Sequence, residues 1–184
     1  MEHHIQLPLT REKVAAIKSG DSVYLTGTLY AARDAAHKRL NGMLRDGKEP
    51  PFPIEDAVIY YVGPTPAKPG QAIGSAGPTT SYRMDAYTPE LLGLGLRGMI
   101  GKGARSAQVI EAIKEAGAVY FGAIGGAGAL LAGCVKSCDV IAFEDLGPEA
   151  ICRIDVEAFP VVAIIDATGE NLYKTGREAY LKGR

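Results

Sequence analysis

The stretch from Gly74 to Ser106 constrains the fold and the chemistry of this 184-residue chain more than any other. Two glycine-flanked polar clusters, 79–83 (Thr-Thr-Ser-Tyr-Arg) and 101–103 (Gly-Lys-Gly), bracket a largely apolar segment. Glycine lets the backbone approach a ligand closely, and each cluster adds a cation, so the pattern indicates an anion pocket. The same residues also fit an ordinary turn followed by helix-capping hydroxyls, with Lys102 at a solvated loop tip.

The overall charge of the chain means that any anion site must be local. Lysine and arginine number 20 against 21 aspartates and glutamates, and the pI is about 6.3. No basic field points to nucleic acid or to an anionic membrane. The N-terminus lacks a signal-peptide pattern, and no run approaches the ~20 apolar residues that span a bilayer. We therefore expect a cytoplasmic protein with no nucleic-acid or membrane partner.

A hydrophobic content of 47 % is ample for one buried core, and we treat residues 1–184 as a single domain. Strands are expected at 5–9, 23–30, 57–62, 118–121, 140–143, 151–156 and 161–165. Helices are expected at 11–18, 31–46 and 106–116, after the glycine-rich loop 122–128 as far as Cys138, and at 174–182. The proline-rich segment 63–70 is interpreted as a loop inside the domain, because too few elements precede it to close a core.

A second candidate site lies where the strand at 23–30 runs into the following helix. Arg33 is near the N-terminal end of that helix, where unpaired backbone N–H groups favour an anion, and His37 follows one turn later on the same face. Asp34, also in the first turn, suits the positive end of the helix dipole. The alternative is that Arg33 belongs to a solvated basic face with His37 at its edge.

Two glycine patterns resemble nucleotide sites, and both fail in detail. In the loop 122–128 the third fingerprint position falls on Leu131, which is neither glycine nor alanine. The lysine cluster is not a P-loop, because Leu96 stands where the first glycine belongs and Gly103 where Ser or Thr should coordinate magnesium. We interpret the small residues of 122–128 as allowing close packing or letting the backbone face a shared substrate pocket.

The cysteines Cys134, Cys138 and Cys152 are odd in number, which speaks against a disulfide framework. On a helix Cys134 and Cys138 would share one face, and three thiolates are enough for an iron–sulfur cluster. Their spacing matches none of the strong zinc or ferredoxin patterns, and buried cysteine commonly acts as a small hydrophobe. We expect this chain to bind no metal and no cofactor of its own.

Three cations from separate segments, Arg33, Arg83 and Lys102, stand among small residues in a nearly neutral protein. This favours a ligand with more than one negative charge, such as a small dicarboxylate held by bidentate arginines. The hydroxyl of Thr79 and the imidazole of His37 are candidates for moving protons. The chain contains no strong electrophile, and the residues alone do not identify the reaction.

Three ordered motifs carry a resemblance to a known family. They are 26–29 (Thr-Gly-Thr-Leu) leading to 33–39 (Arg-Asp-Ala-Ala-His-Lys-Arg), then 77–85 (Gly-Pro-Thr-Thr-Ser-Tyr-Arg-Met-Asp), then 101–103 (Gly-Lys-Gly). The chain resembles the β subunit of the iron–sulfur hydro-lyases, the class I fumarate hydratases and L(+)-tartrate dehydratases. In some members this part is fused as the C-terminal domain. The resemblance covers nearly the whole chain.

The resemblance implies an α/β fold, a three-layer swivelling β/β/α domain with a mixed sheet, that carries no cluster itself. A partner α subunit would hold the 4Fe-4S cluster in a hetero-oligomer, and the isolated chain could form a homodimer. The implied reaction is the trans elimination of water from a 2-hydroxy diacid, run reversibly. The cluster would act on the leaving hydroxyl, which accounts for the missing electrophile.

Matching motif to motif also implies the site residues. The substrate-binding set is Arg33, Thr80, Arg83 and Lys102. Thr79 matches the proposed base, and His37 matches a histidine proposed as catalytic in the tartrate-type members; Arg33 is counted with them as catalytic. An alcohol is a weak acid, so neighbouring cations would have to lower the pKa of Thr79.

Departures from the family pattern leave the substrate open. Ala32 stands where fused fumarases usually show glycine, and Ser81-Tyr82 replaces a small pair. We favour fumarate and malate, with tartrate as the alternative. Two further hypotheses come from other classes: a non-catalytic dicarboxylate-binding domain, and a self-contained nucleotide-dependent enzyme that uses 122–128.

Overall fold

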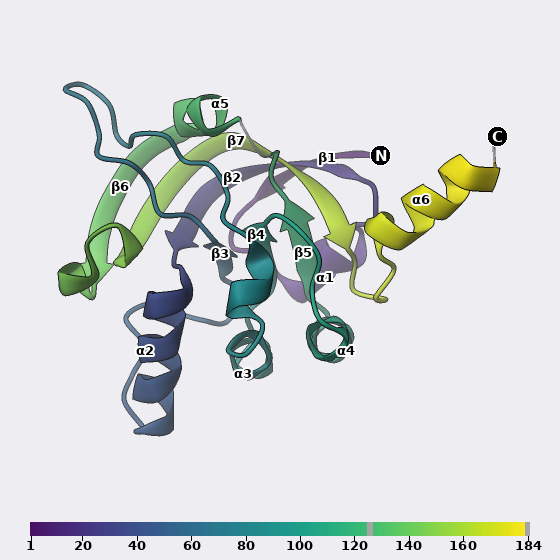
Figure 1. The fold of residues 1–184 in the computed structure, drawn as a ribbon, viewed down its shortest axis with the longest axis horizontal. Coiled ribbons are helices and arrows are strands. Elements are labelled where there is room, and N and C mark those ends of the chain that lie inside the picture. Colours follow the sequence, from purple (N-terminus) through teal and green to yellow (C-terminus); the bar gives the residue numbers. More distant parts are fainter. Residues whose placement is uncertain (125–126, 183–184) are drawn as a thin grey trace.

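The computed structural model describes residues 1–124 and 127–182, which form a mixed β-sheet with helices packed mainly on one side (Figure 1). In these residues the sheet has seven strands in the order β1-β2-β3-β4-β5-β7-β6. The strands are β1 (Glu2–Gln6), β2 (Ser22–Ala31), β3 (Val58–Tyr60), β4 (Gly98–Gly101), β5 (Val119–Gly122), β6 (Val135–Ala142) and β7 (Ile151–Ile165). Strands β1 to β5 are parallel, whereas β7 is antiparallel to each of its neighbours. The expected α/β class with a mixed sheet is confirmed.

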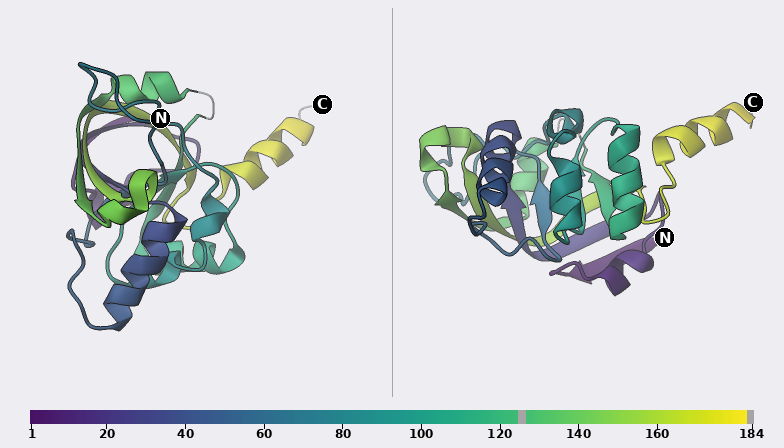
Figure 2. Two further views of the ribbon diagram at one scale, coloured as in Figure 1. Left: turned by 60° about the vertical axis from the view of Figure 1, so that its left-hand side comes forward. Right: turned by 90° about the horizontal axis from the view of Figure 1, so that it is seen from below.

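The sheet closes on itself, because β7 pairs with both β5 and β2 (Figure 2, left). The resulting ring β2-β3-β4-β5-β7 is barrel-like, with β1 and β6 attached beside it. A bulge where Gly27 (φ 121°) lies near Ala158 (φ 48°) shifts the β2–β7 register. Pairing with β2 continues on both sides of this bulge. The two strands expected at 151–156 and 161–165 are therefore one strand, β7.

Helices lie on both faces of the sheet, most of them on one face (Figure 1). They are α1 (Arg11–Ala15), α2 (Asp34–Arg45), α3 (Thr88–Gly93), α4 (Ala107–Ala116), α5 (Gly128–Gly133) and α6 (Leu172–Lys182), with 3₁₀ turns η1 (Ser81–Met84) and η2 (Glu144–Glu149). Helices α2, α3 and α4 lie side by side, and α6 extends away from the body (Figure 2, right). Within the described part of the chain, no helix has both the length and the apolar character needed to cross a membrane.

Local capping explains where two of the expected helices begin. The side chain of Thr10 accepts a hydrogen bond from the Lys13 amide at the start of α1, and Ser106 accepts one from Val109 at the start of α4. These bonds satisfy backbone donors that the first helical turn leaves unpaired. Gly117 ends α4 in the left-handed conformation (φ 63°), as glycine after a helix commonly does.

Two hydrophobic cores lie on opposite sides of the sheet. Alternate residues of β3 separate between them: Tyr60 belongs to the core inside the barrel, whereas Ile59 and Tyr61 pack towards the helices. Strand β5 divides in the same way, with Phe121 inside and Tyr120 on the helix side. This period of two follows from the pleat of the strands, and it fixes which side chains face the helical layer.

Two sequence-based expectations about secondary structure are wrong. The helix expected to reach Cys138 ends at Gly133, and β6 begins at Val135, because this segment pairs with β7. The β4 strand was not expected, since Gly-Met-Ile-Gly is short and rich in glycine. The swivelling three-layer description and the extent of the domain over 1–184 remain predictions.

Candidate active site

The predicted site residues gather at the carboxyl ends of the parallel strands. Strands β2, β3, β4 and β5 are in register there, with Ala31 opposite Tyr60, Tyr60 opposite Ile100 and Ile100 opposite Phe121. Arg33 follows the end of β2, and Lys102 directly follows β4. In open α/β sheets this edge is the usual place for a ligand, because the connecting loops and helix N-termini converge on it.

Backbone hydrogen bonds bring the two glycine-flanked clusters together at this edge. The Thr79 amide donates to the Tyr61 carbonyl over 2.8 Å, and the Ser81 amide donates to the Lys102 carbonyl over 2.9 Å. Thr80 and Lys102 form an isolated parallel bridge between these bonds. The sequence-based expectation that both clusters belong to one site is therefore consistent with the geometry.

The side chains of this edge differ in exposure. Thr79 and Thr80 are half-buried, Lys102 is exposed, and Tyr82 is 66 % exposed. Within residues 1–124 and 127–182, neither the ammonium of Lys102 nor the hydroxyl of Thr79 has a hydrogen-bond or ion-pair partner. A free cation and a free hydroxyl therefore stand on the same strand edge, available to a ligand.

Gly101 makes the close approach of the clusters possible. A Cβ atom at this position would lie 2.0 Å from Ser81 Oγ and 2.9 Å from Tyr61 Cδ2, well inside van der Waals contact. Only glycine fits here without moving the buried Ser81 side chain.

We expect Gly101→Ala to lower the free energy of unfolding by about 1–3 kcal/mol, because the added methyl overpacks this contact. Gly42→Ala is the matched control: it lies in α2, where an added Cβ would have no atom within 4 Å, so alanine there should stabilise by about 1 kcal/mol. Urea unfolding of both variants measures the difference. Equal effects of the two substitutions would contradict the packing described here.

Arg33 and Arg83 are linked through carboxylates of this chain. Arg83 Nη2 donates to Asp34 Oδ2 over 2.9 Å, and Arg33 Nη2 lies 3.2 Å from Glu149 Oε1. Arg33 Nε is 3.8 Å from Asp34 Oδ1, and both of these buried atoms lack a hydrogen-bond partner among the described residues. The two arginines predicted to bind a dicarboxylate therefore lie on either side of Asp34, with hydrogen-bonding capacity left over.

His37 is fully buried rather than exposed at the edge. Its Nδ1 lies 2.8 Å from the Arg33 carbonyl, so Nδ1 carries the proton and donates, while Nε2 has no partner in the described residues. The ring packs edge-on against Tyr61, with 5.4 Å between centroids. Burial lowers the pKa of His37 to about 4, so the imidazole is neutral at neutral pH. It holds the backbone of Arg33, and its predicted catalytic role remains a prediction.

We expect the buried His37 to make stability depend on pH between about 6.5 and 4. The unfolded chain binds this proton near the ordinary pKa of 6.5 and the folded chain only near 4, so stability falls as the pH falls through that window. The loss attributable to His37 is about 3 kcal/mol. His37→Asn keeps a donor for the Arg33 carbonyl without titrating, so urea unfolding of the variant should lack this part of the slope. An identical slope in both proteins would contradict the assignment.

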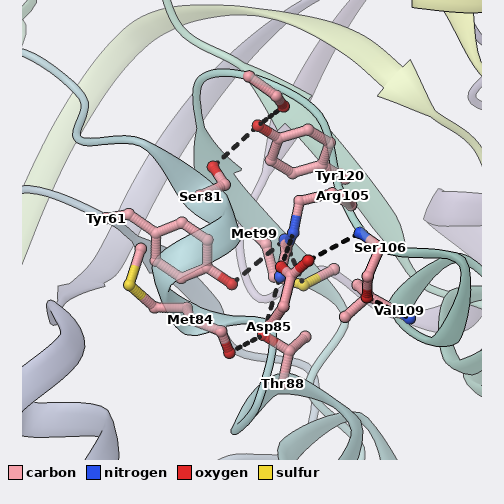
Figure 3. A network of polar contacts seen from close by, with 11 residues as sticks. Tyr61, Ser81, Met84, Asp85, Thr88, Met99, Arg105, Ser106, Val109 and Tyr120 are labelled. Atoms are coloured by element: carbon pink, nitrogen blue, oxygen red, sulfur yellow. Dashed lines mark hydrogen bonds and ion pairs between the residues drawn. The ribbon is translucent and has the colours of Figure 1, made fainter.

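A buried network beneath the edge, centred on Arg105, was not predicted from the sequence (Figure 3). Arg105 donates from Nε to Asp85 Oδ1 over 2.7 Å and from Nη2 to Thr88 Oγ1 over 2.8 Å, and its side chain is 0 % exposed. Its guanidinium also lies over the rings of Tyr61 and Tyr120, 5.4 and 5.0 Å from their centroids. The network ties η1 to α4, because Asp85 also accepts from the backbone amide at the start of α4.

Tyr120 connects this network to the two clusters (Figure 3). Its hydroxyl lies 2.8 Å from Ser81 Oγ and 2.8 Å from the Gly103 carbonyl. Burial raises the pKa of Tyr120 well above its usual range, so it remains a neutral hydrogen-bonding group. The sequence gives little sign of this network beyond the charged residues of the short runs 83–85 (Arg-Met-Asp) and 104–106 (Ala-Arg-Ser).

Neither the large hollows nor the cysteines belong to this edge. A hollow of about 520 Å³ lies between the loop 65–75 and residues 129–135, and none of the six predicted site residues lines it. Cys134 ends α5, Cys138 lies in β6 and Cys152 in β7, so the helix face expected for the first two is not formed. Residues 1–124 and 127–182 hold no group of three or more potential metal ligands. The loop 122–128 includes residues 125–126, which lie outside the described residues.

The chain belongs to the family described as Fumarase C-terminus, which matches residues 1–176. Similar proteins include "Fumarate hydratase class I, aerobic" of Escherichia coli K12, which is 42 % identical over 152 residues covering 82 % of this chain and 28 % of that protein. "Fumarate hydratase 2" of Leishmania major is 39 % identical over 165 residues, covering 89 % of this chain and 29 % of that protein. The chain thus spans less than a third of these fumarate hydratases.

A separate relative has nearly the same length as this chain. The "Putative L(+)-tartrate dehydratase subunit beta" of Methanocaldococcus jannaschii is 37 % identical over 172 residues, covering 90 % of this chain and 88 % of that protein. The resemblance to the hydro-lyase family inferred from the sequence motifs is therefore confirmed. The relatives carry hydro-lyase names of two kinds, and both kinds match the same chain.

Proposed function

We propose that this chain is the β part of a class I fumarate hydratase and acts in the reversible hydration of fumarate to L-malate. The observation that carries the proposal is the gathering of Arg33, Thr79, Arg83 and Lys102 on one strand edge, with hydrogen-bonding capacity left free. To bind a C4 dicarboxylate and remove a proton from it, a site needs cations for the two carboxylates and one proton acceptor. The arginines and the lysine are the proposed cations, and Thr79 is the proposed proton acceptor.

In this proposal the arginines and the lysine bind the substrate carboxylates. Arg33 and Arg83 already hold carboxylates in a comparable way, through Glu149 and Asp34. Lys102 stabilises the negative charge that grows on the substrate as its proton leaves, and the half-buried Thr80 adds a hydroxyl at the same edge. Contacts between these cations and the substrate carboxylates are stronger in a partly buried site than they would be in water.

Thr79 is the proposed base that takes the proton from the carbon next to the one bearing the hydroxyl. A free alcohol is too weakly acidic for this, so the neighbouring cations must lower the pKa of Thr79. His37 acts behind this site by fixing the backbone carbonyl of Arg33. Its neutral state at neutral pH suits that role, because a charged imidazole there would be buried and would be repelled by Arg105.

The electrophile in this proposal is a 4Fe-4S cluster held by a separate α subunit, which would act as Lewis acid on the leaving hydroxyl. In this proposal the three cysteines of this chain, Cys134, Cys138 and Cys152, hold no cluster. Every step assigned to this chain is therefore one of binding or proton transfer. A swivel of the domain over the partner would bring its cationic edge to the cluster.

The second candidate is the β subunit of an L(+)-tartrate dehydratase, which converts tartrate to oxaloacetate. It is supported by the match to the tartrate dehydratase β relative, which is 37 % identical to this chain over 172 residues. The same edge would bind malate or tartrate, because both carry two carboxylates and a 2-hydroxyl.

The test is anaerobic co-purification of this chain with a candidate cluster-bearing α chain, after cluster reconstitution, followed by turnover of malate and then of tartrate. We expect association and malate turnover that requires both chains. Turnover of tartrate alone would move the assignment to the second candidate. Association with diacid binding but no turnover would favour a non-catalytic dicarboxylate-binding domain.

A further inference from the structure

Glu149 reaches the candidate site from a distant part of the chain. It is the last residue of η2, yet its Oε2 accepts a hydrogen bond from the Ala35 amide over 3.1 Å, 114 residues away in sequence. Its Oε1 lies 3.2 Å from Arg33 Nη2. A single carboxylate therefore contacts both the first turn of α2 and the arginine proposed to bind substrate.

The helix depends on Glu149 for a cap that its own sequence does not provide. Arg33 is the N-cap residue of α2 and makes no side-chain cap hydrogen bond. The first-turn amides of a helix need an outside acceptor, and a carboxylate there also suits the positive end of the helix dipole. If Glu149 moved away, the Ala35 amide would lose its hydrogen-bond acceptor. This hydrogen bond therefore favours keeping Glu149 in place when a ligand binds.

The guanidinium of Arg33 is held on several sides. A Cβ atom at Gly63 would lie 2.8 Å from Arg33 Nη1 and 2.9 Å from its Cδ, so the side chain lies directly against the backbone there. Asp34 Oδ1 is 3.8 Å from Arg33 Nε. Glu149 completes this arrangement with the only hydrogen-bond-length contact to the guanidinium in the described residues. An arginine side chain usually loses conformational entropy when it binds a ligand. Because these contacts already order the Arg33 side chain, less entropy is lost on binding.

We propose that Glu149 is a positioning residue that orients Arg33 towards the substrate carboxylate, an inference that rests on the proposed function. Glu149 remains bound to the Ala35 amide and to Arg33 during turnover, and it does not touch the substrate. Arg33 retains Nη1 for the incoming carboxylate, because Nη1 has no hydrogen-bond or ion-pair partner in the described residues, whereas Nε is buried.

The kinetic test uses the assembled two-chain enzyme carrying Glu149→Gln, in which the amide oxygen still accepts from the Ala35 amide but the ion pair is lost. We expect a fall in kcat/KM of about 10-fold to 100-fold, mainly through a higher KM, with the melting temperature little changed. In an Arg33→Ala background the same substitution should cause no further loss, because Glu149 acts through Arg33. Asp145→Asn is the matched control: it removes a carboxylate of the same segment, which pairs with Arg39, and should leave the kinetics unchanged.

A second measurement needs no turnover. The Arg33 Nε–H resonance, assigned by its absence in Arg33→Lys, should be sharp in the isolated chain and broadened in Glu149→Gln. A sharp signal in both proteins, or additive kinetic losses in the double variant, would overturn the inference. A lower KM in Glu149→Gln would also overturn it, since it would mean that Glu149 competes with substrate. An Arg33→Ala enzyme with wild-type activity would instead contradict the proposed function, and the two failures are thus distinguishable.

Discussion

Replacing Thr79 with alanine is expected to lower kcat of the assembled hydro-lyase by about 10²-fold to 10⁴-fold, the usual contribution of a positioned general base. The Thr79 amide is fixed to the Tyr61 carbonyl, so the backbone should keep its place when the side chain is shortened. The hydroxyl has no partner in the described part of the chain, so its removal leaves no buried group unpaired. A large effect would therefore report on chemistry and not on folding.

Thr79→Ser is the matched control, because it retains the hydroxyl on the same backbone. We expect it to keep most of the activity, and both variants to unfold at wild-type urea concentrations. Steady-state turnover of malate, with the partner chain and its cluster in excess, measures the loss. An alanine variant within a few-fold of wild type would remove Thr79 from the proton transfer and leave it a lining residue.

Replacing Arg105 with methionine is expected to lower the free energy of unfolding by about 3–5 kcal/mol, the range for removing one partner of a buried ion pair. Methionine has a similar volume, so the effect would come from the lost ion pair and hydrogen bonds rather than from a cavity. Asp85, whose side chain is 14 % exposed, would lose its closest cationic partner, and Thr88 would lose a donor. Because the network supports η1, the edge that carries Thr79 should also lose its order.

Arg39→Met serves as the control for Arg105→Met. Arg39 is also in a close ion pair, with Asp145, but its side chain is 40 % exposed, and exposed pairs contribute little to stability. Urea unfolding of the two variants should therefore differ clearly. Similar small losses for both would contradict the claim that the buried contacts of Arg105 stabilise this part of the fold.

Local signals in the sequence predicted those parts of the fold that depend on neighbouring residues. The helices at 11–18 and 106–116 were expected, and the caps at Thr10 and Ser106 and the glycine stop at Gly117 are each decided within one helical turn. The segment 135–138 was expected to be helical and forms the start of β6, because its partner β7 lies far along the chain. Closure of the sheet by β2 and β7 likewise has no local signature, since pairing partners are chosen by the whole fold.

In the candidate site, too, the residues with a local sequence signal were predicted and those without one were not. Thr79, Arg83 and Lys102 were found from glycine-flanked motifs, and Arg33 was found from the junction between a strand and the following helix; both signals are local in the sequence. Glu149 was not found, because it contacts Arg33 from far along the chain and its own Pro-Glu-Ala run carries no motif. Carboxylates that serve distant arginines can be recognised only once the fold brings them together.

The most direct measurement is the malate-dependent formation of fumarate by the anaerobically reconstituted pair of chains, comparing wild type with Arg33→Ala and Arg45→Ala. Both arginines lie at α2, but Arg45 is at the far end, where it pairs with Glu90. We predict that activity requires both chains, falls by about 10²-fold to 10³-fold in Arg33→Ala and is unchanged in Arg45→Ala. Equal activity of all three proteins would contradict the claim that this strand edge binds the substrate.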